Sequence, residues 1–342
     1  NCGLPYFVSD VISDRDALLL QTPESLWRRF RLEVRTNTRV IAIDRASQTV
    51  TAVNGLTGEE FTDSYDYLVL ATGARPRTLD VPGGARALAL RDVADADRLK
   101  AAAGNAKTAV VVGAGFVGVE VAENLRHLGL EVTLVQRQGQ ILSGFDIEMI
   151  EALQAKLEAN GIRLALETQL TSVEGDSVTL ASGARIAADI VIAAAGVVPD
   201  NALAVAAGLK IGDTGGLWVD EQQRTSDQRI LAAGDAVEKL GELSGNQTLI
   251  PLANLANRHG RLIADVIAGV ETQAHAALGT AIIGAFGMVA AMTGLTEAAA
   301  RKAGIAATSI HIHPGSHAGY YPGAKRVSLK VTFDPTNGRL LG

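Results

Sequence analysis

The single cysteine of this sequence, Cys2, is the residue with the widest range of redox chemistry. Gly3 and Pro5 follow it and predict a turn or a helix start, where backbone N–H groups favour the thiolate form. A lone cysteine is more often an inert core residue, so its neighbours leave both interpretations open. One cysteine rules out an intrachain C-x-x-C redox pair and a disulfide framework. The pair His311 and His313 has strand spacing and no cysteine nearby, so we expect no metal site.

The stretch from Gly113 to Gly118 is a G-x-G-x-x-G motif in the context that such a motif needs. An apolar strand, 108–112, precedes it, and a helix at about 116–128 follows it. Gly113 permits the tight turn, Gly115 lets a pyrophosphate approach the backbone, and Gly118 lets the helix pack on the strand. The N-terminus of the helix adds N–H donors and positive potential for phosphates. The motif therefore predicts a dinucleotide-binding βαβ unit.

Two further positions bear on which ligands bind. Gln136 and Arg137 end the second strand of this unit, where NAD-binding proteins usually carry Asp or Glu. No carboxylate is there to repel a 2′-phosphate and Arg137 could pair with it, so we expect NADPH to be accepted. Asp235 follows Gly234 at the end of a buried strand. It could accept hydrogen bonds from ligand hydroxyls or cap a helix, and both interpretations stay open.

Composition and charge exclude several classes of protein. The chain has 342 residues, of which 47% are hydrophobic and 20% charged, as expected of a globular protein with a large core. The net charge of −6 provides no global field that attracts nucleic acid, and the basic cluster of Arg28, Arg29 and Arg31 is interpreted as a solvated helix face. The longest apolar run, 281–292, is too short to span a bilayer. No secretory signal is visible, which predicts a cytoplasmic protein without a membrane segment.

The pattern along the chain predicts alternating strands and helices. Helices are expected at about 23–30, 92–104, 116–128, 146–160, 253 to beyond 264 and 296–302, and buried strands at about 67–70, 108–112, 131–135, 189–193 and 229–233. From about residue 278 the pattern changes to an α+β segment. The first residue is Asn1 rather than Met, and the turn at 334–338 predicts a strand that is only beginning at Gly342. We therefore expect the chain to be cut at both ends.

Several motifs occur in one order over nearly the whole chain. They are Asn1-Cys2-Gly3-Leu4-Pro5-Tyr6-Phe7, Gln21-Thr22-Pro23-Glu24, Ala71-Thr72-Gly73, Gly113 to Gly118 with Glu120, Gly196-Val197-Val198-Pro199, Thr225-Ser226-Asp227, Ala233-Gly234-Asp235 and Ser316-His317-Ala318-Gly319-Tyr320-Tyr321-Pro322-Gly323-Ala324. In this the chain resembles the single-cysteine branch of the pyridine nucleotide-disulfide oxidoreductases. The first and last stretches are similar to those of coenzyme A-disulfide reductases and NADH-dependent persulfide reductases. NADH oxidases and peroxidases of the branch usually carry other residues around the cysteine.

The resemblance implies an α/β fold with two Rossmann-like nucleotide-binding domains, for FAD and NAD(P), and a C-terminal α+β dimerisation domain. The implied boundaries are 1–77 for the first part of the FAD domain, 78–223 for the NAD(P) domain, 224–275 for the second part of the FAD domain and 276–342 for the dimerisation domain. A homodimer is implied as well.

The resemblance also implies roles for individual residues. Cys2 would be the redox cysteine beside the flavin, with Asn1 next to it. Tyr320 or Tyr321 would reach the active site of the partner subunit as a proton donor or thiolate stabiliser. The residues implied for the cofactors are Thr72, Gly73, Gly234 and Asp235 for FAD, and Gly113, Gly115, Gly118, Glu120, Gln136, Arg137 and Gly196 for the nicotinamide nucleotide.

Three departures from the family pattern stand out. The FAD-binding glycine motif, which precedes the cysteine in the family, does not occur in this sequence, so we expect this chain to bind FAD poorly. Val198 stands where the family commonly has Arg. Asn254 and Leu255 replace a usual Gly-Pro pair, which leaves the local helix start open.

The reaction implied by the resemblance is reduction of coenzyme A disulfide, or of a coenzyme A persulfide or polysulfide, with reducing equivalents that pass from NAD(P)H through FAD to sulfur at Cys2. The nearest alternative is an NADH oxidase or peroxidase that cycles Cys2 through sulfenic acid. A nucleotide-binding redox sensor without turnover is an alternative of another class. A flavin-dependent reductase of a protein partner would not need the cysteine.

Overall fold

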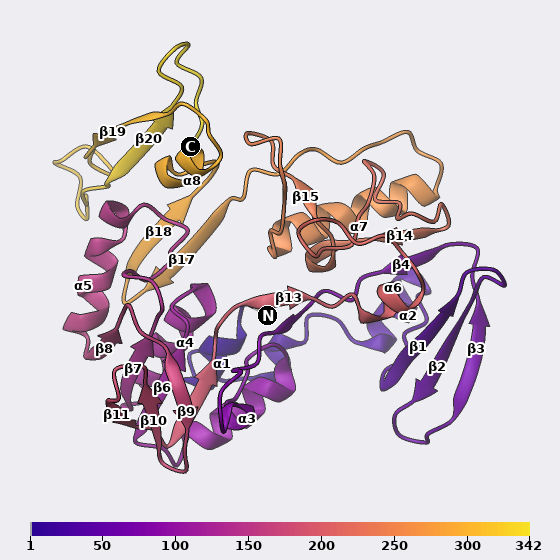
Figure 1. Ribbon diagram of the computed structural model, residues 1–342, viewed down its shortest axis with the longest axis horizontal. Helices are drawn as coiled ribbons and strands as arrows, with labels where there is room; N and C mark the ends of the chain where they lie inside the picture. Colours follow the sequence, from indigo (N-terminus) through magenta and orange to yellow (C-terminus); the bar gives the residue numbers. More distant parts are fainter. Residues whose placement is uncertain (1) are drawn as a thin grey trace. The chain divides into compact units, whose positions relative to one another are not determined.

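The structure is a computed structural model and describes residues 2–342 (Figure 1). Its residues form two compact units. Unit 1 contains the chain up to Asp14, then Pro76–Gly196 and Leu278–Gly342, and unit 2 contains Arg15–Arg75 and Val197–Ala277. The assignment of FAD, NAD(P) and dimerisation roles to parts of these units stays a prediction.

A parallel sheet of four strands forms the centre of unit 1. Its strands, in spatial order, are β12 (Ile190–Ala193), β6 (Thr108–Val112), β7 (Glu131–Val135) and β8 (Ile162–Ala165). Val110 pairs with Thr133 on one side and with Val191 on the other, and all three side chains are buried. Burial on both faces explains why these strands are near-continuous apolar runs, as the sequence predicts for 108–112 and 131–135.

Three helices pack on or beside this sheet. They are α3 (Val93–Ala103), α4 (Phe116–His127) and α5 (Glu151–Ala159). Asp92 caps α3 through a reciprocal capping box with Asp95, which confirms the predicted start of this helix. The expected helix at 146–160 is wrong in its first turns, because the 3-10 turn η3 (Ile147–Met149) precedes α5. The carboxylate of Asp146 does not cap this segment and instead accepts the backbone N–H groups of Glu297 and Ala298.

The short helix α1 (Leu4–Val8) follows Cys2 and Gly3. Leu4, Phe7 and Val8 are buried where α1 packs against α3 and α4. From α3, the Lys100 ammonium group donates to the Phe7 carbonyl at 3.0 Å. The segment that carries the cysteine is therefore held by apolar packing within unit 1.

Smaller sheets complete unit 1. The antiparallel strands β9 (Leu170–Val173), β10 (Ser177–Leu180) and β11 (Arg185–Ala187) form one sheet, and η2 (Gly84–Arg86) lies beside it. The C-terminal part contains β17 (Ala281–Ala285), β18 (Met288–Met292), α8 (Glu297–Lys302), β19 (Thr308–Ile312) and β20 (Leu329–Phe333). The strand expected after the turn at 334–338 is present as a bridge between Phe333 and Leu340. This part is α+β, as the sequence predicts.

Unit 2 combines an antiparallel meander with a parallel strand pair. The meander consists of β1 (Thr38–Asp44), β2 (Thr49–Asn54) and β3 (Glu60–Ser64), and β4 (Leu68–Leu70) pairs in parallel with β14 (Ile230–Ala232). The remaining elements are η1 (Arg15–Leu18), α2 (Pro23–Phe30), α6 (Ala202–Ala206), η4 (Gly234–Ala236), β15 (Lys239–Leu240), β16 (Gln247–Thr248) and α7 (Ala253–Ile267). The strand pair of β5 (Ala74–Pro76) and β13 (Val197–Pro199) lies at the two points of the sequence where the units meet.

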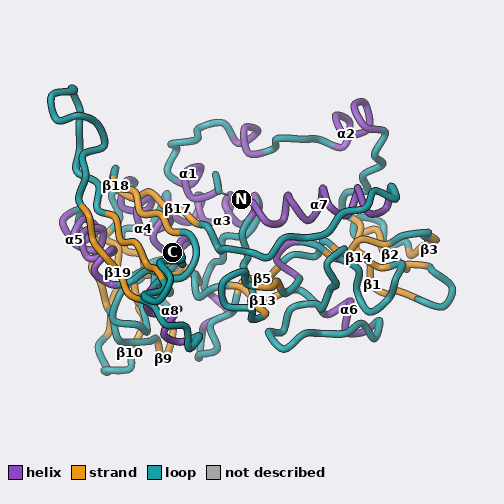
Figure 2. Tube along the Cα trace, turned by 90° about the horizontal axis from the view of Figure 1, so that it is seen from above, coloured by secondary structure: helices purple, strands orange, loops and turns teal. Residues whose placement is uncertain are grey.

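Two helix starts in unit 2 follow different rules. Thr22 caps α2 with Pro23 at its first position, as predicted. The long helix α7 (Figure 2) begins at Ala253 without a side-chain cap, so Asn254 and Leu255 lie in its first turn. The replacement of the usual Gly-Pro pair therefore leaves this helix intact.

Candidate active site

The glycine turn between β6 and α4 has the geometry of a phosphate cradle. Gly113 has φ +105°, and a Cβ there would lie 2.3 Å from the Ala194 carbonyl oxygen. A Cβ on Gly118 would lie 1.9 Å from the Gly113 carbonyl oxygen. Gly115, the N-cap of α4, has nothing within 4 Å of its Cβ position. Two glycines thus satisfy packing, and the third leaves open space at the helix N-terminus for a pyrophosphate.

Gln136 and Arg137 follow β7 directly. The Gln136 side-chain oxygen lies 3.5 Å from the Ala114 amide nitrogen, which places the end of β7 beside the glycine turn. Arg137 is exposed there. These positions suit contact with the adenosine part of a nucleotide, and acceptance of NADPH stays a prediction.

Cys2 is exposed. It lies in the turn before α1, and Gly3 is the N-cap of that helix. The interpretation of the only cysteine as an inert core residue is therefore wrong. Because α1 packs against α4, the cysteine segment and the glycine turn belong to the same unit.

A cluster of titratable groups lies where α1 meets α4. Burial, and then the charge of Glu123, raises the pKa of Glu120 to about 7. Burial, followed by the charges of Glu120, Glu123 and Cys2, raises the pKa of Tyr6 above its ordinary value. Tyr6 therefore keeps its proton at neutral pH, whereas Glu120 is close to half-protonated there. A carboxyl group that gains and loses its proton near pH 7 suits an active site.

Sequence reasoning missed Tyr6 and Glu123 as members of this cluster. Glu123 is 7% exposed, and its carboxylate accepts the backbone N–H of Phe286 at 2.5 Å. Phe286 belongs to the hairpin turn between β17 and β18, and its ring meets His127 edge-on at 5.4 Å. The spacing of three between Glu120 and Glu123, one helical turn, was the available signal.

The residues predicted for FAD lie in unit 2. Asp235 is half-buried in η4, directly after β14, and Gly234 has φ +75°. Asp235 caps no long helix, because α7 begins only at Ala253. Gly73 has φ +68°, and its carbonyl accepts the N–H of Asp200 at 2.9 Å. Thr72 is exposed beside it.

The two tyrosines of the C-terminal segment differ in their surroundings. Tyr320 is 91% exposed, whereas the ring of Tyr321 stacks on His317 with centroids 5.5 Å apart. Both tyrosines lie between β19 and β20 in unit 1. Asn1 lies outside the described residues.

The predicted site residues thus divide between the two units. Unit 1 holds Cys2, Gly113, Gly115, Gly118, Glu120, Gln136, Arg137, Gly196, Tyr320 and Tyr321, and unit 2 holds Thr72, Gly73, Gly234 and Asp235. Gly196 has φ +93°, and nothing lies within 4 Å of its Cβ position.

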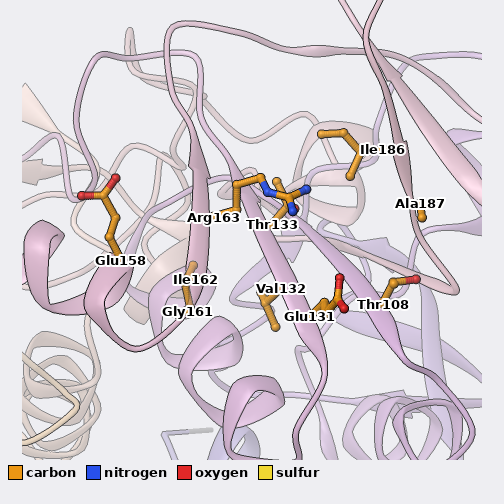
Figure 3. Close-up of a pocket in the computed structure, with 10 residues that line it drawn as sticks. All are labelled: Thr108, Glu131, Val132, Thr133, Glu158, Gly161, Ile162, Arg163, Ile186 and Ala187. Carbon is orange, nitrogen blue, oxygen red and sulfur yellow. The ribbon is translucent and has the colours of Figure 1, made fainter.

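A pocket of about 380 Å³ lies away from these residues (Figure 3). It opens at the amino-terminal ends of β6, β7 and β8, where Glu131, Arg163 and Thr108 line it. The glycine turn is at the carboxyl ends of the same strands, the edge at which such sheets bind nucleotides. The pocket is therefore not the predicted nucleotide site.

Among the described residues, no group of three or more His, Cys, Asp and Glu side chains could hold a metal ion. In the same part of the chain, every helix is too short or too polar to cross a bilayer.

Three known proteins are similar to this chain over its whole length. The coenzyme A disulfide reductase of Staphylococcus haemolyticus is 33% identical over 344 residues, which cover 100% of this chain and 78% of the relative. The NADH oxidase of Methanocaldococcus jannaschii is 34% identical, and the NAD(P)H coenzyme A polysulfide/persulfide reductase of Pyrococcus horikoshii is 31% identical; each match covers 100% of this chain and 77% of the relative.

Among solved structures, the reduced CoADR-RHD protein of Bacillus anthracis matches 99% of this chain with a TM-score of 0.97 and 38% identity. The match spans 62% of that protein. These likenesses confirm the predicted fold class with Rossmann-like nucleotide-binding domains.

The family description that matches residues 1–260 is pyridine nucleotide-disulphide oxidoreductase. FAD and NAD(P)H are the cofactors of this family, as the sequence predicts. The chain belongs to the pyridine nucleotide-disulphide oxidoreductase family.

Proposed function

We propose that this protein is an FAD-dependent NAD(P)H oxidoreductase that reduces coenzyme A disulfide, or a coenzyme A persulfide or polysulfide, through Cys2. The observation that carries the proposal is the exposed thiol in the same unit as the glycine turn. The coenzyme A disulfide reductase and persulfide reductase relatives support the substrate class.

The overall reaction is a two-electron reduction of a sulfur–sulfur bond. One disulfide, one NAD(P)H and one proton give two thiols and NAD(P)⁺. The Cys2 thiolate attacks one substrate sulfur and breaks the S–S bond. The other sulfur leaves as a thiolate that takes up a proton, and a mixed disulfide remains on Cys2. Two electrons, which derive from NAD(P)H, then cleave that mixed disulfide, so that the second substrate thiol leaves with a proton and the Cys2 thiolate is restored. A single cysteine suffices, because the substrate itself supplies the second sulfur.

The remaining predicted residues serve binding and proton supply. FAD supplies the chemistry that joins hydride transfer to thiol–disulfide exchange. Asp235 would accept hydrogen bonds from a flavin ribityl hydroxyl, and Gly115 with the α4 N-terminus would hold the nucleotide pyrophosphate. Glu120 would line the nicotinamide site, and Tyr320 or Tyr321 would act in the site of a partner subunit in a homodimer.

Replacement of Cys2 by Ser tests the proposal. We expect reduction of the bound flavin by NAD(P)H to stay intact and coenzyme A-disulfide turnover to be lost, because no other thiol exists in the chain. Stopped-flow absorbance measures the first step, and NAD(P)H oxidation measures the second. Alkylation of the wild-type protein provides a matched control, since iodoacetamide should produce the same loss. Disulfide turnover that survives in Cys2→Ser would refute the mechanism.

An NADH oxidase or peroxidase is the second candidate, and the Methanocaldococcus relative favours it. In that case Cys2 would cycle through sulfenic acid and the oxidant would be oxygen or peroxide. Oxygen consumption compared with coenzyme A-disulfide consumption by the same flavin-loaded sample separates the two. A homodimer and a cytoplasmic location remain parts of the proposal.

A further inference from the structure

Lys239 is an unusual residue of unit 2, because it is a buried lysine next to the predicted flavin-binding turn. It begins β15, three residues after the end of η4, and is 6% exposed. Its ammonium group donates to the carbonyl of Gly234 at 2.8 Å and to that of Val237 at 3.0 Å. Both accepting oxygens are neutral.

The surroundings of Lys239 make its charge costly. Burial lowers the pKa of Lys239 to about 8, although the nearby charge of Asp235 opposes this shift. The charge of the lysine also acts on His259 of α7. Burial, and then the charge of Lys239, lowers the pKa of His259 to about 4, so this ring is neutral. Its Nδ1 is buried and has no hydrogen-bond partner among the described residues. Burial of an ammonium group is costly unless local interactions offset the loss of water.

The two hydrogen bonds that Lys239 donates provide this local interaction. Gly234 and Val237 flank the two inner residues of the turn, and Asp235 is one of them. The only other hydrogen bond recorded for the Gly234 carbonyl within residues 2–342 comes from the Val237 N–H at 3.4 Å, which is long. Lys239 therefore makes the shorter contact to Gly234 and also holds the far end of the turn.

We propose that Lys239 is the positioning residue of the turn from Gly234 to Val237, and that its ammonium group, bonded to both ends, fixes the direction in which Asp235 presents its carboxylate to a flavin ribityl hydroxyl. The second half of this statement rests on the proposed function. The first half concerns the chain alone. Loss of the Lys239 proton at alkaline pH removes the charge-assisted bonds and loosens the turn.

Amide hydrogen exchange tests the first half without any flavin. The amides of residues 235–237 are followed at pH 7 in the wild type, in Lys239→Met and in Lys210→Met, which removes an exposed lysine of the same unit. We expect exchange at these amides to be at least about tenfold faster in Lys239→Met and unchanged in Lys210→Met. Unchanged exchange in a folded Lys239→Met would overturn the proposal.

If Lys239→Met does not fold, the pH dependence of amide exchange in the wild type still tests the proposal. Its exchange at residues 235–237, relative to amides of β14, should accelerate between about pH 7 and pH 9.5, with a midpoint near the pKa of about 8. A flat ratio contradicts the proposal.

Flavin titration tests the second half. We expect FAD to bind Lys239→Met about tenfold or more weakly than Lys210→Met, as measured by quenching of flavin fluorescence. Equal affinities, in proteins whose exchange at the turn differs, would overturn the positioning role. If even the wild-type protein binds no FAD, the result agrees with the absence of the FAD-binding glycine motif from this sequence. The exchange data still decide whether Lys239 holds the turn.

Discussion

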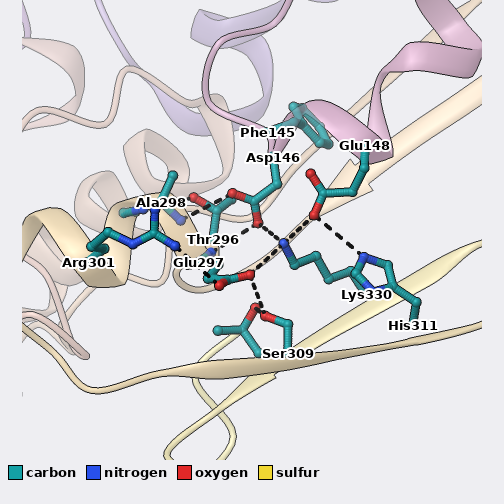
Figure 4. A network of polar contacts seen from close by, with 12 residues as sticks. Phe145, Asp146, Glu148, Thr296, Glu297, Ala298, Arg301, Ser309, His311 and Lys330 are labelled. Atoms are coloured by element: carbon teal, nitrogen blue, oxygen red, sulfur yellow. Dashed lines mark hydrogen bonds and ion pairs between the residues drawn. The ribbon is translucent and has the colours of Figure 1, made fainter.

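Lys239 of unit 2 is buried and Lys330 of unit 1 has a largely covered side chain, but their partners are opposite in kind. The side chain of Lys330 is 7% exposed (Figure 4). Its Nζ lies 2.9 Å from Asp146 Oδ2, 2.5 Å from Glu148 Oε1 and 3.0 Å from Glu297 Oε2. Lys239 instead donates to two carbonyls.

The pKa values of the two lysines shift in opposite directions. Burial lowers the pKa of Lys330, but the hydrogen bonds to Glu148, Asp146 and Glu297 outweigh it and raise that pKa above its ordinary value. For Lys239 the pKa falls to about 8, because carbonyl dipoles and one nearby carboxylate do not compensate for lost water.

The two lysines therefore have different structural roles. Lys330 connects segments far apart in the sequence, since its carboxylate partners lie before α5 and at the start of α8. It holds the C-terminal strands of unit 1 to the α5 region by charge. Lys239 acts within one turn. The comparison teaches that buried charge in this protein stabilises the fold where carboxylates surround it and sets local geometry where they do not.

The largest effect should come from Lys330→Met. Three carboxylates would lose the Lys330 ammonium group, and Asp146 would stay covered without it, so we expect a loss of about 3–5 kcal/mol in the free energy of unfolding. Urea unfolding monitored by circular dichroism measures this loss. The matched control is Lys302→Met at an exposed lysine, which should change stability by no more than about 0.5 kcal/mol. A loss of similar size in both variants would end the contrast between the two lysines.

Acid should weaken the same ion-pair network and lower the stability of the fold by a smaller amount. Burial raises the pKa of Asp146, but the hydrogen bonds from Lys330 and from two backbone N–H groups outweigh burial and lower that pKa. A carboxylate with a lowered folded pKa stabilises the fold above its ordinary pKa, and this contribution disappears as pH falls through the folded value. We expect wild-type stability to fall by about 1–2 kcal/mol below about pH 4, and by less in Lys330→Met. If stability fell equally with pH in the wild type and in Lys330→Met, the ion pair between Asp146 and Lys330 would not be the cause.

The smallest effect on stability should come from Lys239→Met. Removal of a buried charge and loss of two hydrogen bonds oppose each other, so we expect a change within about 1 kcal/mol at pH 7. Because the folded pKa of about 8 is below the ordinary value of 10.5, the unfolded chain binds more protons between these two values. Wild-type stability should therefore rise across that interval relative to Lys239→Met. Urea midpoints between pH 7.5 and 10 measure the difference, and a wild-type slope that falls instead would reverse the interpretation of Lys239.

Local sequence rules predicted elements wherever the determining residues are close together. Thr22 and Asp92 start their helices as expected, because a cap needs only an N–H three positions away. The expected helix start at Asp146 was wrong, because its carboxylate binds N–H groups about 150 residues away in sequence.

The candidate site divides in the same way. The roles of Gly113, Gly115 and Gly118 follow from backbone geometry that a short motif encodes. The exposure of Cys2 and the coupling of Glu120 to Tyr6 depend on how α1 packs on α4, which the sequence pattern did not specify.

The sequence by itself determined the strand–glycine turn–helix unit, the family pattern and the presence of one thiol. The tertiary structure alone decided which lysines are buried, which carboxylates surround them and which carboxyl group carries a proton near pH 7. The physical reason is that dihedral preferences and caps act over a few residues, whereas burial and Coulomb energy depend on distances in space that only packing sets.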